Sequence, residues 1–174
     1  MGYLMVESEY LRLVAVVAAV RERHAGLLAE MGPTHEAGGG WHDNAAFDHL
    51  KADERRVLTY LRQLEDFLRD CMIVQRKDSY AEVEIGCIVL AAEIDAAGEA
   101  VRKQWILIAG DTRPPRNAIL DDGDEGDGTG PDDPFAVSTD SPIGKALMGA
   151  KIGDERQARV NERVRITYRV LELG

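Results

Sequence analysis

Two stretches of the chain carry matching heptad patterns, and this feature constrains the fold more than any other. Over residues 5–31 and 44–74, apolar residues recur at alternating spacings of three and four. This pattern is typical of helices that pack along a single partner helix. His24 and Glu54 are the polar residues that interrupt the two stripes. A short connection joins the stretches, so we expect an antiparallel coiled-coil hairpin. The stripe positions are Val6, Tyr10, Leu13, Val17, Val20, His24, Leu27 and Met31, then Phe47, Leu50, Glu54, Val57, Leu61, Leu64, Leu68 and Cys71.

The residues between the stripes indicate where the hairpin turns. Pro33 lacks an amide proton and disfavours helical backbone at Gly32, so we expect the first helix to stop there. Residues 34–37 could form one further turn. The glycines at 38–40 permit unusual backbone dihedrals. Asp43 or Asn44 is suited to cap the second helix, because an Asp or Asn side chain can accept from its first free amides.

After residue 75 the hydrophobic pattern changes from a helical period to a period of two, which predicts strands. We therefore predict an α+β protein, with the hairpin at 1–75 and its tip at 32–44, followed by a small β-rich domain at 76–174. The expected elements of this domain are strands at 83–94, 101–108, 135–138 and 164–173, and a short helix at 144–148.

Residues 111–134 interrupt the β-rich half with a stretch rich in Pro, Gly and Asp. This composition predicts a mobile acidic loop. A calcium-binding loop is the alternative: Asp122 and Asp124 fit its first two ligand positions. Gly126 occupies the third position, however, and no Glu closes the loop.

Composition narrows the class of function. The formal net charge is −10, whereas a protein that binds nucleic acid unaided is usually basic. An acidic surface fits a protein partner or a positively charged cavity. Cys71 and Cys87 are too few and too widely spaced for a zinc ribbon or a disulfide framework, and we expect reduced thiols. No apolar run is long enough to span a membrane and the N-terminus lacks a signal-peptide pattern, so we expect a cytoplasmic protein without a membrane partner.

A family resemblance rests on the segment S-T-D-S-P-I-G-K-A-L-M-G-A-K-I-G-D-E, residues 138–155. It resembles the C-terminal domain of the GreA/GreB transcription elongation factors, which carries S-x-x-S-P-L-G-K-A-L-x-G-x-x-x-G-D. The resemblance implies that the β-rich domain is FKBP-like. It also implies that Ser141, Pro142 and Ile143 form a surface presented to RNA polymerase. The same residues suit a strand-to-helix turn, with Ser141 as cap and Pro142 at the first helical position.

The tip is similar to the family motif G-D-x-x-E-N-A-E-Y, with Asn44 matched, Asp43 in place of Glu and Gly40 in place of the first Asp. In that family the hairpin enters the secondary channel of RNA polymerase. Its two carboxylates help to hold the second Mg²⁺ of the polymerase active site, which cuts backtracked RNA. The resemblance therefore implies that Asp43 is the catalytic and Mg²⁺-binding residue, that the protein is no enzyme and has no cofactor of its own, and that it meets the nascent RNA 3′ end only inside the polymerase.

The loss of one tip acid makes strong stimulation of transcript cleavage doubtful, because two-metal hydrolysis needs a firmly positioned second metal. Glu36 or Asp48 could replace the missing acid, but Asp48 lies a few residues inside the second helix and Glu36 lies before the glycines. A non-cleaving regulator or inhibitor that occupies the channel is the alternative. The other expected contact residues are Trp41, His42, Asn44 and Lys51. Trp41 could instead pack on Phe47 within the tip. Lys51 could instead be part of a solvated helix face.

Three further interpretations compete with the resemblance. His35, Glu36, His42 and Asp43 could bind a transition metal, although their spacing matches no standard zinc motif. A prolyl isomerase would need a deep aromatic pocket, for which the β-rich half has few aromatic residues. A plain coiled-coil adaptor would need only the hairpin.

Overall fold

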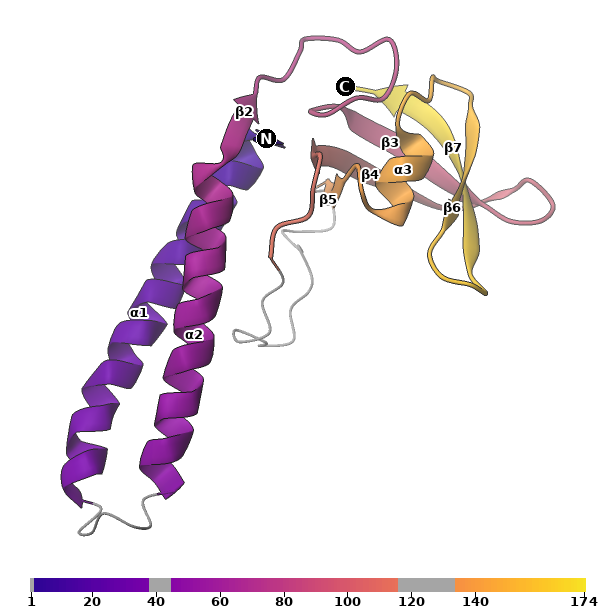
Figure 1. Cartoon of the computed structure of the whole chain (residues 1–174). Coiled ribbons are helices and arrows are strands. Elements are labelled where there is room, and N and C mark those ends of the chain that lie inside the picture. The colour runs from indigo at the N-terminus through magenta and orange to yellow at the C-terminus, as the bar shows by residue number, and fades with distance from the viewer. Residues whose placement is uncertain (1, 38–44, 116–133) are drawn as a thin grey trace. The chain divides into compact units, whose positions relative to one another are not determined.

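The computed structural model describes residues 2–37, 45–115 and 134–174 (Figure 1). Contacts divide the chain into two compact units. One unit combines Met1–Tyr10, Cys71–Arg113 and Gly123–Gly174, and the other contains Leu11–Asp70 and Pro114–Asp122. The predicted fold class is confirmed: the protein is α+β, with a helical hairpin followed by a small β-rich sheet domain. The predicted boundary between the hairpin and the β-rich domain at residue 75 cuts the chain at a single point, whereas each of the two units combines separate segments. The boundary stays a prediction.

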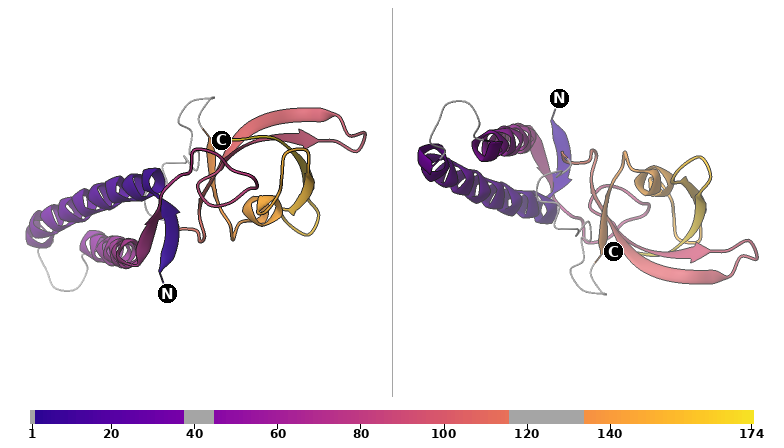
Figure 2. Two further views of the ribbon diagram at one scale, coloured as in Figure 1. Left: turned by 90° about the horizontal axis from the view of Figure 1, so that it is seen from above. Right: turned by 90° about the horizontal axis from the view of Figure 1, so that it is seen from below.

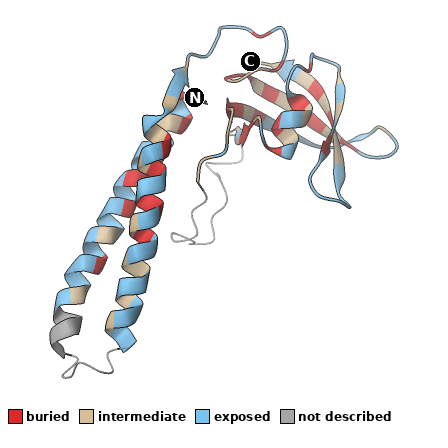
Figure 3. Cartoon of the chain, viewed as in Figure 1, coloured by how far each residue is buried: buried red, intermediate tan, exposed pale blue. Residues whose placement is uncertain are grey.

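The hairpin consists of α1 (Glu7–Ala37) and α2 (Ala45–Arg69), which lie side by side and run antiparallel (Figure 1). The apolar stripes of the two helices form the seam between them, and the buried positions of both helices face one another (Figure 3). The side chains at its core are those predicted from the heptad pattern, together with Tyr60. They are Val17, Val20, Leu27, Val57, Tyr60, Leu61 and Leu64.

The prediction that Pro33 ends the first helix is wrong, because α1 continues to Ala37. Pro33 removes the donor of one backbone hydrogen bond, yet extending an existing helix is far easier than starting one. The second helix ends earlier than predicted. Its last residue is Arg69, and Cys71–Val74 is a strand, β2. The first helix also starts later, because Met5 and Val6 belong to strand β1 (Tyr3–Val6).

Within the described residues, the β-rich unit contains a seven-stranded sheet with the order β2-β1-β4-β3-β7-β6, and β5 pairs with β4. Antiparallel pairs join β3 to both β4 and β7, and join β7 to β6, while β5 runs parallel to β4. The remaining strands are β3 (Ile88–Ile94), β4 (Ala100–Gly110), β5 (Phe135–Ser138), β6 (Glu155–Arg159) and β7 (Arg165–Leu173).

The short strands β1 and β2 join this sheet from distant parts of the sequence. They pair in parallel, from Tyr3 opposite Cys71 to Val6 opposite Val74, and Met5 lies opposite Gly110 on β4. A Cβ at Gly110 would lie 2.6 Å from the backbone oxygen of Leu4. Glycine at this position therefore lets β1 approach β4.

A short helix, α3 (Pro142–Leu147), packs against the sheet near β5 and β6, as Figure 2 shows from two sides. Its Leu147 is fully buried in the core of this unit, beside Val89, Ile106 and Tyr168. The predicted helix at 144–148 is therefore real but begins two residues earlier, at the proline.

The strand predictions were right for the long strands and incomplete for the short ones. β4, β5 and β7 lie where their alternating patterns predicted, whereas the strand predicted from Val83 begins only at Ile88. The prediction missed β1, β2 and β6. Among these, β6 has the sequence E-R-Q-A-R, in which Ala158 alone is buried. A strand with one small apolar residue gives no readable alternation.

Two simpler features of the chain follow from the described residues. None of the helices there is both long enough and apolar enough to cross a membrane.

Cys71 and Cys87 do not form a disulfide. Cys87 is fully buried, and this burial raises the pKa of its thiol, so the thiol stays protonated at neutral pH.

The seam of the hairpin predicts the effect of truncating a core leucine. Leu64→Ala should lower the free energy of unfolding by about 2–5 kcal/mol, because it removes a fully buried side chain. Leu11→Ala is the matched control, since Leu11 on α1 is 58% exposed, and it should change stability by less than about 1 kcal/mol. Urea unfolding followed by helical circular dichroism measures both, and equal losses would contradict the seam.

Candidate site for a protein partner

The turn before α3 is built around the hydroxyl of Ser141. This side chain is buried, donates to the backbone oxygen of Ser138 at 2.7 Å and accepts from the amide of Gly144 at 3.0 Å. It is the cap of α3, with Pro142 at the start of the helix. The local role predicted for Ser141 is therefore present. Both hydrogen-bonding functions of its hydroxyl are already used inside the protein.

Gly144 lets the start of α3 lie directly against the end of β5. A Cβ built on Gly144 would clash with the backbone oxygen of Ser138, and would lie 2.8 Å from its carbonyl carbon and 3.0 Å from the Cα of Thr139. Backbone atoms cannot move aside as a flexible side chain can. The glycine of the S-P-I-G sequence is thus required by packing.

The rest of the turn is braced by side chains from both sides. Asp140 accepts from the hydroxyl of Ser138, and the hydroxyl of Thr139 donates to the backbone oxygen of Asp111 at 3.0 Å. After the helix, Val83 exchanges two backbone hydrogen bonds with Gly149 and Ala150, each 2.8 Å long. The motif Ser138–Glu155 is therefore fixed at both ends, so the surface it presents is pre-organised.

The exposed residues at α3 differ from the three that the sequence predicted as a contact surface, Ser141, Pro142 and Ile143. Pro142 is exposed, whereas Ile143 is half-buried and packs against the core. Lys145 and Met148 follow Pro142 at spacings of three and are also exposed. The spacing places Pro142 and Lys145 on one face of the helix, and Met148 follows them as the residue that caps its C-terminal end. This face, Pro142–Lys145–Met148, combines apolar groups with one cation. The spacing of three was visible in the sequence, but only the burial of Ile143 shows which face is outward.

On the hairpin, Lys51 is the predicted contact residue that the structure describes. Its Nζ lies 4.3 Å from the centroid of the Phe47 ring, one turn earlier on α2. This cation–π contact restrains the ammonium group near the start of the helix. Lys51 and the Ser141 turn lie in different units.

The two polar interruptions of the stripes meet across the seam. His24 Nε2 lies 2.9 Å from Glu54 Oε1, and the two side chains are 20% and 19% exposed. The two side chains therefore provide each other with one polar partner, and His24 is a partly buried member of the seam. Nearby, Arg21 on α1 contacts Glu65 on α2 at 2.6 Å, but that pair is largely exposed and contributes little.

The predicted tip residues lie outside the described part of the chain. This applies to Gly40, Trp41, His42, Asp43 and Asn44. The alternative transition-metal site and the alternative calcium loop fall on the same undescribed stretches, apart from the backbone at 35–36. Among the described residues, no three His, Cys, Asp or Glu side chains lie together in a way that could hold a metal ion.

Comparisons with known proteins bear on the segment that contains the turn. Residues 128–174 match the family model "Transcription elongation factor, GreA/GreB, C-term". The chain is also 30% identical over 115 residues to transcription elongation factor GreA of Macrococcus caseolyticus, and 24% identical over 132 residues to GreA of Acetivibrio thermocellus. The predicted resemblance to the GreA/GreB family is confirmed.

The match to these GreA proteins is partial. The alignment with the Macrococcus protein covers 65% of this chain and 59% of its relative, and the alignment with the Acetivibrio protein covers 75% and 70%. Among solved structures, the crystal structure of GreA factor homolog 1 (Gfh1) of Thermus thermophilus aligns with 100% of this chain and 99% of that one, at 20% identity and a TM-score of 0.43. The segment that the family model matches, residues 128–174, contains the motif at residues 138–155 from which the resemblance was predicted.

The packing of Gly144 predicts that a single methyl group disrupts the GreA/GreB-like turn. Gly144→Ala should lower the free energy of unfolding by at least about 2 kcal/mol, because backbone must shift to admit the Cβ. The control is Gly26→Ala within α1, where a Cβ meets nothing within 4 Å. That change should stabilise by about 0.5–1 kcal/mol, since alanine favours the helix. Thermal unfolding measures both, and a neutral Gly144→Ala would contradict the close approach.

The seam pair predicts a coupling energy between His24 and Glu54. Each single change to Leu leaves the partner partly buried without its hydrogen bond and should cost about 1–3 kcal/mol. The double change removes both polar groups and should cost less than the sum of the two, with a coupling energy of about 0.5–3 kcal/mol. Additive losses in a double-mutant cycle would show that the contact has no energetic role.

Proposed function

We propose that this protein binds RNA polymerase through its β-rich unit and inserts the helical hairpin into the secondary channel. There it modulates elongation and the fate of backtracked complexes. The observation that carries the proposal is the GreA/GreB match of residues 128–174, which contain the braced turn and the exposed face of α3. In this role the protein acts in the cytoplasm, and the polymerase supplies the active site.

The face formed by Pro142, Lys145 and Met148 is suited to a protein partner. Its apolar groups can be buried in a contact, and the rigid turn reduces the ordering cost of association. Ser141 then acts as a positioning residue, because its hydroxyl holds the cap, while Ile143 anchors the helix to the core. The predicted contact surface is thereby refined from three consecutive residues to one helix face that begins at Pro142.

The hairpin is long and narrow enough to enter a channel. The 25 residues of α2 span roughly 38 Å at about 1.5 Å per residue. The apolar seam and the contact between His24 and Glu54 hold the two helices together over this distance. Such a hairpin can carry the residues that follow Ala37 into a narrow channel without unfolding.

The acidic residues of the tip sequence decide what the hairpin can do there. A loosely held Mg²⁺ in the polymerase active site needs oxygen ligands in a fixed arrangement. Asp43 supplies one carboxylate, and Gly40 stands where the related motif has a second. We propose that Asp43 contacts this Mg²⁺, with Trp41, His42 and Asn44 as neighbouring contacts. One carboxylate gives weak or no stimulation of cleavage, so a non-cleaving regulator of the channel is the second form of this proposal.

We propose that Lys51 is a further contact residue of the hairpin inside the polymerase. The ring of Phe47 restrains its ammonium group about two turns of helix beyond Asn44. A cation at this place can contact a phosphate of the nascent RNA near its 3′ end, within the polymerase.

The test is RNA cleavage in a purified backtracked elongation complex with added protein. We expect slow cleavage with the unsubstituted chain and at least about tenfold faster cleavage with Gly40→Asp, because the second carboxylate fixes the metal and its attacking water. Asp43→Asn keeps the size of the side chain but removes its charge, and should abolish whatever stimulation exists. Asp70→Asn, at an exposed carboxylate just after the last residue of α2 and therefore at the opposite end of that helix from the tip, is the matched control and should leave the rate unchanged.

Two outcomes would contradict the proposal in different ways. Failure of the unsubstituted chain to bind the polymerase would refute the function as a whole. Binding that is normal in every variant, with no gain of cleavage from Gly40→Asp, would refute the role assigned to the tip acids and leave the non-cleaving form.

A further inference from the structure

The turn between β6 and β7, residues 159–165, has the sequence R-V-N-E-R-V-R and presents three arginines and one glutamate, Glu162, on its surface. All seven residues are exposed. Arg159 and Arg165 are directly opposite each other, at the last pair of the β6–β7 ladder. The neighbouring pair, Ala158 and Ile166, packs against the core of the unit. Because side chains alternate along a strand, Arg159 and Arg165 project together from the other face.

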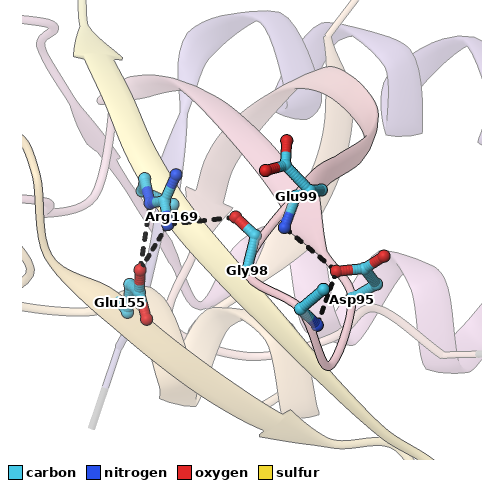
Figure 4. A network of polar contacts seen from close by, with 6 residues as sticks. Asp95, Gly98, Glu99, Glu155 and Arg169 are labelled. Carbon is cyan, nitrogen blue, oxygen red and sulfur yellow. Dashed lines mark hydrogen bonds and ion pairs between the residues drawn. The ribbon is translucent and has the colours of Figure 1, made fainter.

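This arrangement is unfavourable for the fold alone. Like charges directly opposite on an antiparallel pair are destabilising. Elsewhere on the same two strands, arginines have acidic partners. Arg156 contacts Asp154 at 2.9 Å, and Arg169 donates to Glu155 at 2.7 and 3.0 Å (Figure 4). In the described part of the chain, no ion pair is formed by Arg159, Arg163 or Arg165.

Hydrogen bonds within the turn brace its backbone. The side-chain oxygen of Asn161 accepts from the amides of Arg163 and Val164, at 2.9 and 2.8 Å, and the amide of Val160 donates to the oxygen of Val164 at 3.0 Å. The arginines are thus mounted on a fixed backbone, so a partner does not have to order the turn when it binds.

Two apolar side chains accompany the arginines. Val160 and Val164 are 44% and 42% exposed. A phosphate backbone offers little for valines to contact, whereas a protein surface can cover them. Arginine forms bidentate hydrogen bonds with carboxylates, and it is the cation most enriched at protein interfaces. The chemistry of the turn therefore fits Asp and Glu side chains beside small apolar groups.

We propose that the basic turn 159–165 is a second docking surface, separate from the face of α3, that binds an acidic and partly apolar patch on RNA polymerase. This inference rests on the proposed function. The net charge of −10 disfavours approach to acidic surfaces in general. A local cluster of three arginines, none of which forms an ion pair with another described residue, then selects where such a surface is accepted.

The experiment measures the affinity for RNA polymerase at several salt concentrations. We expect Arg159→Glu combined with Arg163→Glu and Arg165→Glu to weaken binding by at least about tenfold at low salt, with a shallower salt dependence. Lys103→Glu combined with Lys151→Glu is the control, since both lysines are exposed in the same unit, and it should weaken binding by less than about threefold.

A single substitution separates binding from stability. Arg159→Glu places a carboxylate opposite Arg165, so it should raise the Tm of the β-rich unit by about 1–4 °C while it weakens polymerase binding. Fluorescence of Trp105 in a Trp41→Phe background reports this melting. A variant that melts higher and binds worse cannot owe its lost binding to unfolding.

The results that overturn the inference are distinct. Unchanged polymerase affinity in the triple variant overturns it directly. If the unsubstituted chain binds a labelled single-stranded RNA or duplex DNA, and the triple variant loses only that binding, the turn is a nucleic-acid surface and the inference is wrong. If the unsubstituted chain does not bind polymerase at all, the proposed function fails first.

Discussion

The close approach of Gly144 to the backbone of Ser138 is the contact on which the candidate docking face depends. It brings the first turn of α3 against the end of β5, within reach of the Ser141 hydroxyl, which then caps the helix. The helix is only six residues long, too short to be stable by itself. Its orientation is therefore set by this packing and by Leu147 in the core. Pro142, Lys145 and Met148 point outward because the opposite side of the helix is held inward.

The sequence predicted those parts of the fold that rest on repeated patterns. The two heptad stripes identified the hairpin, and the polar interruptions His24 and Glu54 proved to be partners in space. A stripe analysis locates such residues on each helix, but it does not say that they meet, because the relative register of two helices is a property of their packing. Pro33 misled the prediction because the rule that proline disfavours a helix interior is local, whereas an existing helix can continue past a proline at the cost of one backbone hydrogen bond.

The missed strands show the limit of period-two patterns. β1 and β2 are four residues each and come from stretches that also fit the helical stripes, so Val6 and Cys71 had been assigned to helices. Their pairing joins positions nearly 70 residues apart in the chain, and no local pattern carries that information. For the candidate site, the motif identified Ser141 and Pro142, whereas the outward face of α3 and the basic turn required burial and register.

In the β-rich unit, some polar side chains form hydrogen bonds or ion pairs within the protein, whereas others form none that the described residues show. Ser141, Asp154 and Arg169 are polar residues of the β-rich unit whose side chains are engaged by their neighbours. Their roles are consistent with folding alone. Arg159 and Arg165 lie opposite each other, although the chain is rich in acidic residues, with 31 Asp and Glu. Folding alone favours an acidic residue at one of these positions, and an external partner gives a reason for arginine at both. The same reasoning applies to Met148, an exposed apolar side chain at the end of a helix whose Ile143 and Leu147 pack in the core. Among the described residues, each of the two surfaces to which we assign binding thus contains groups that the fold neither pairs nor covers.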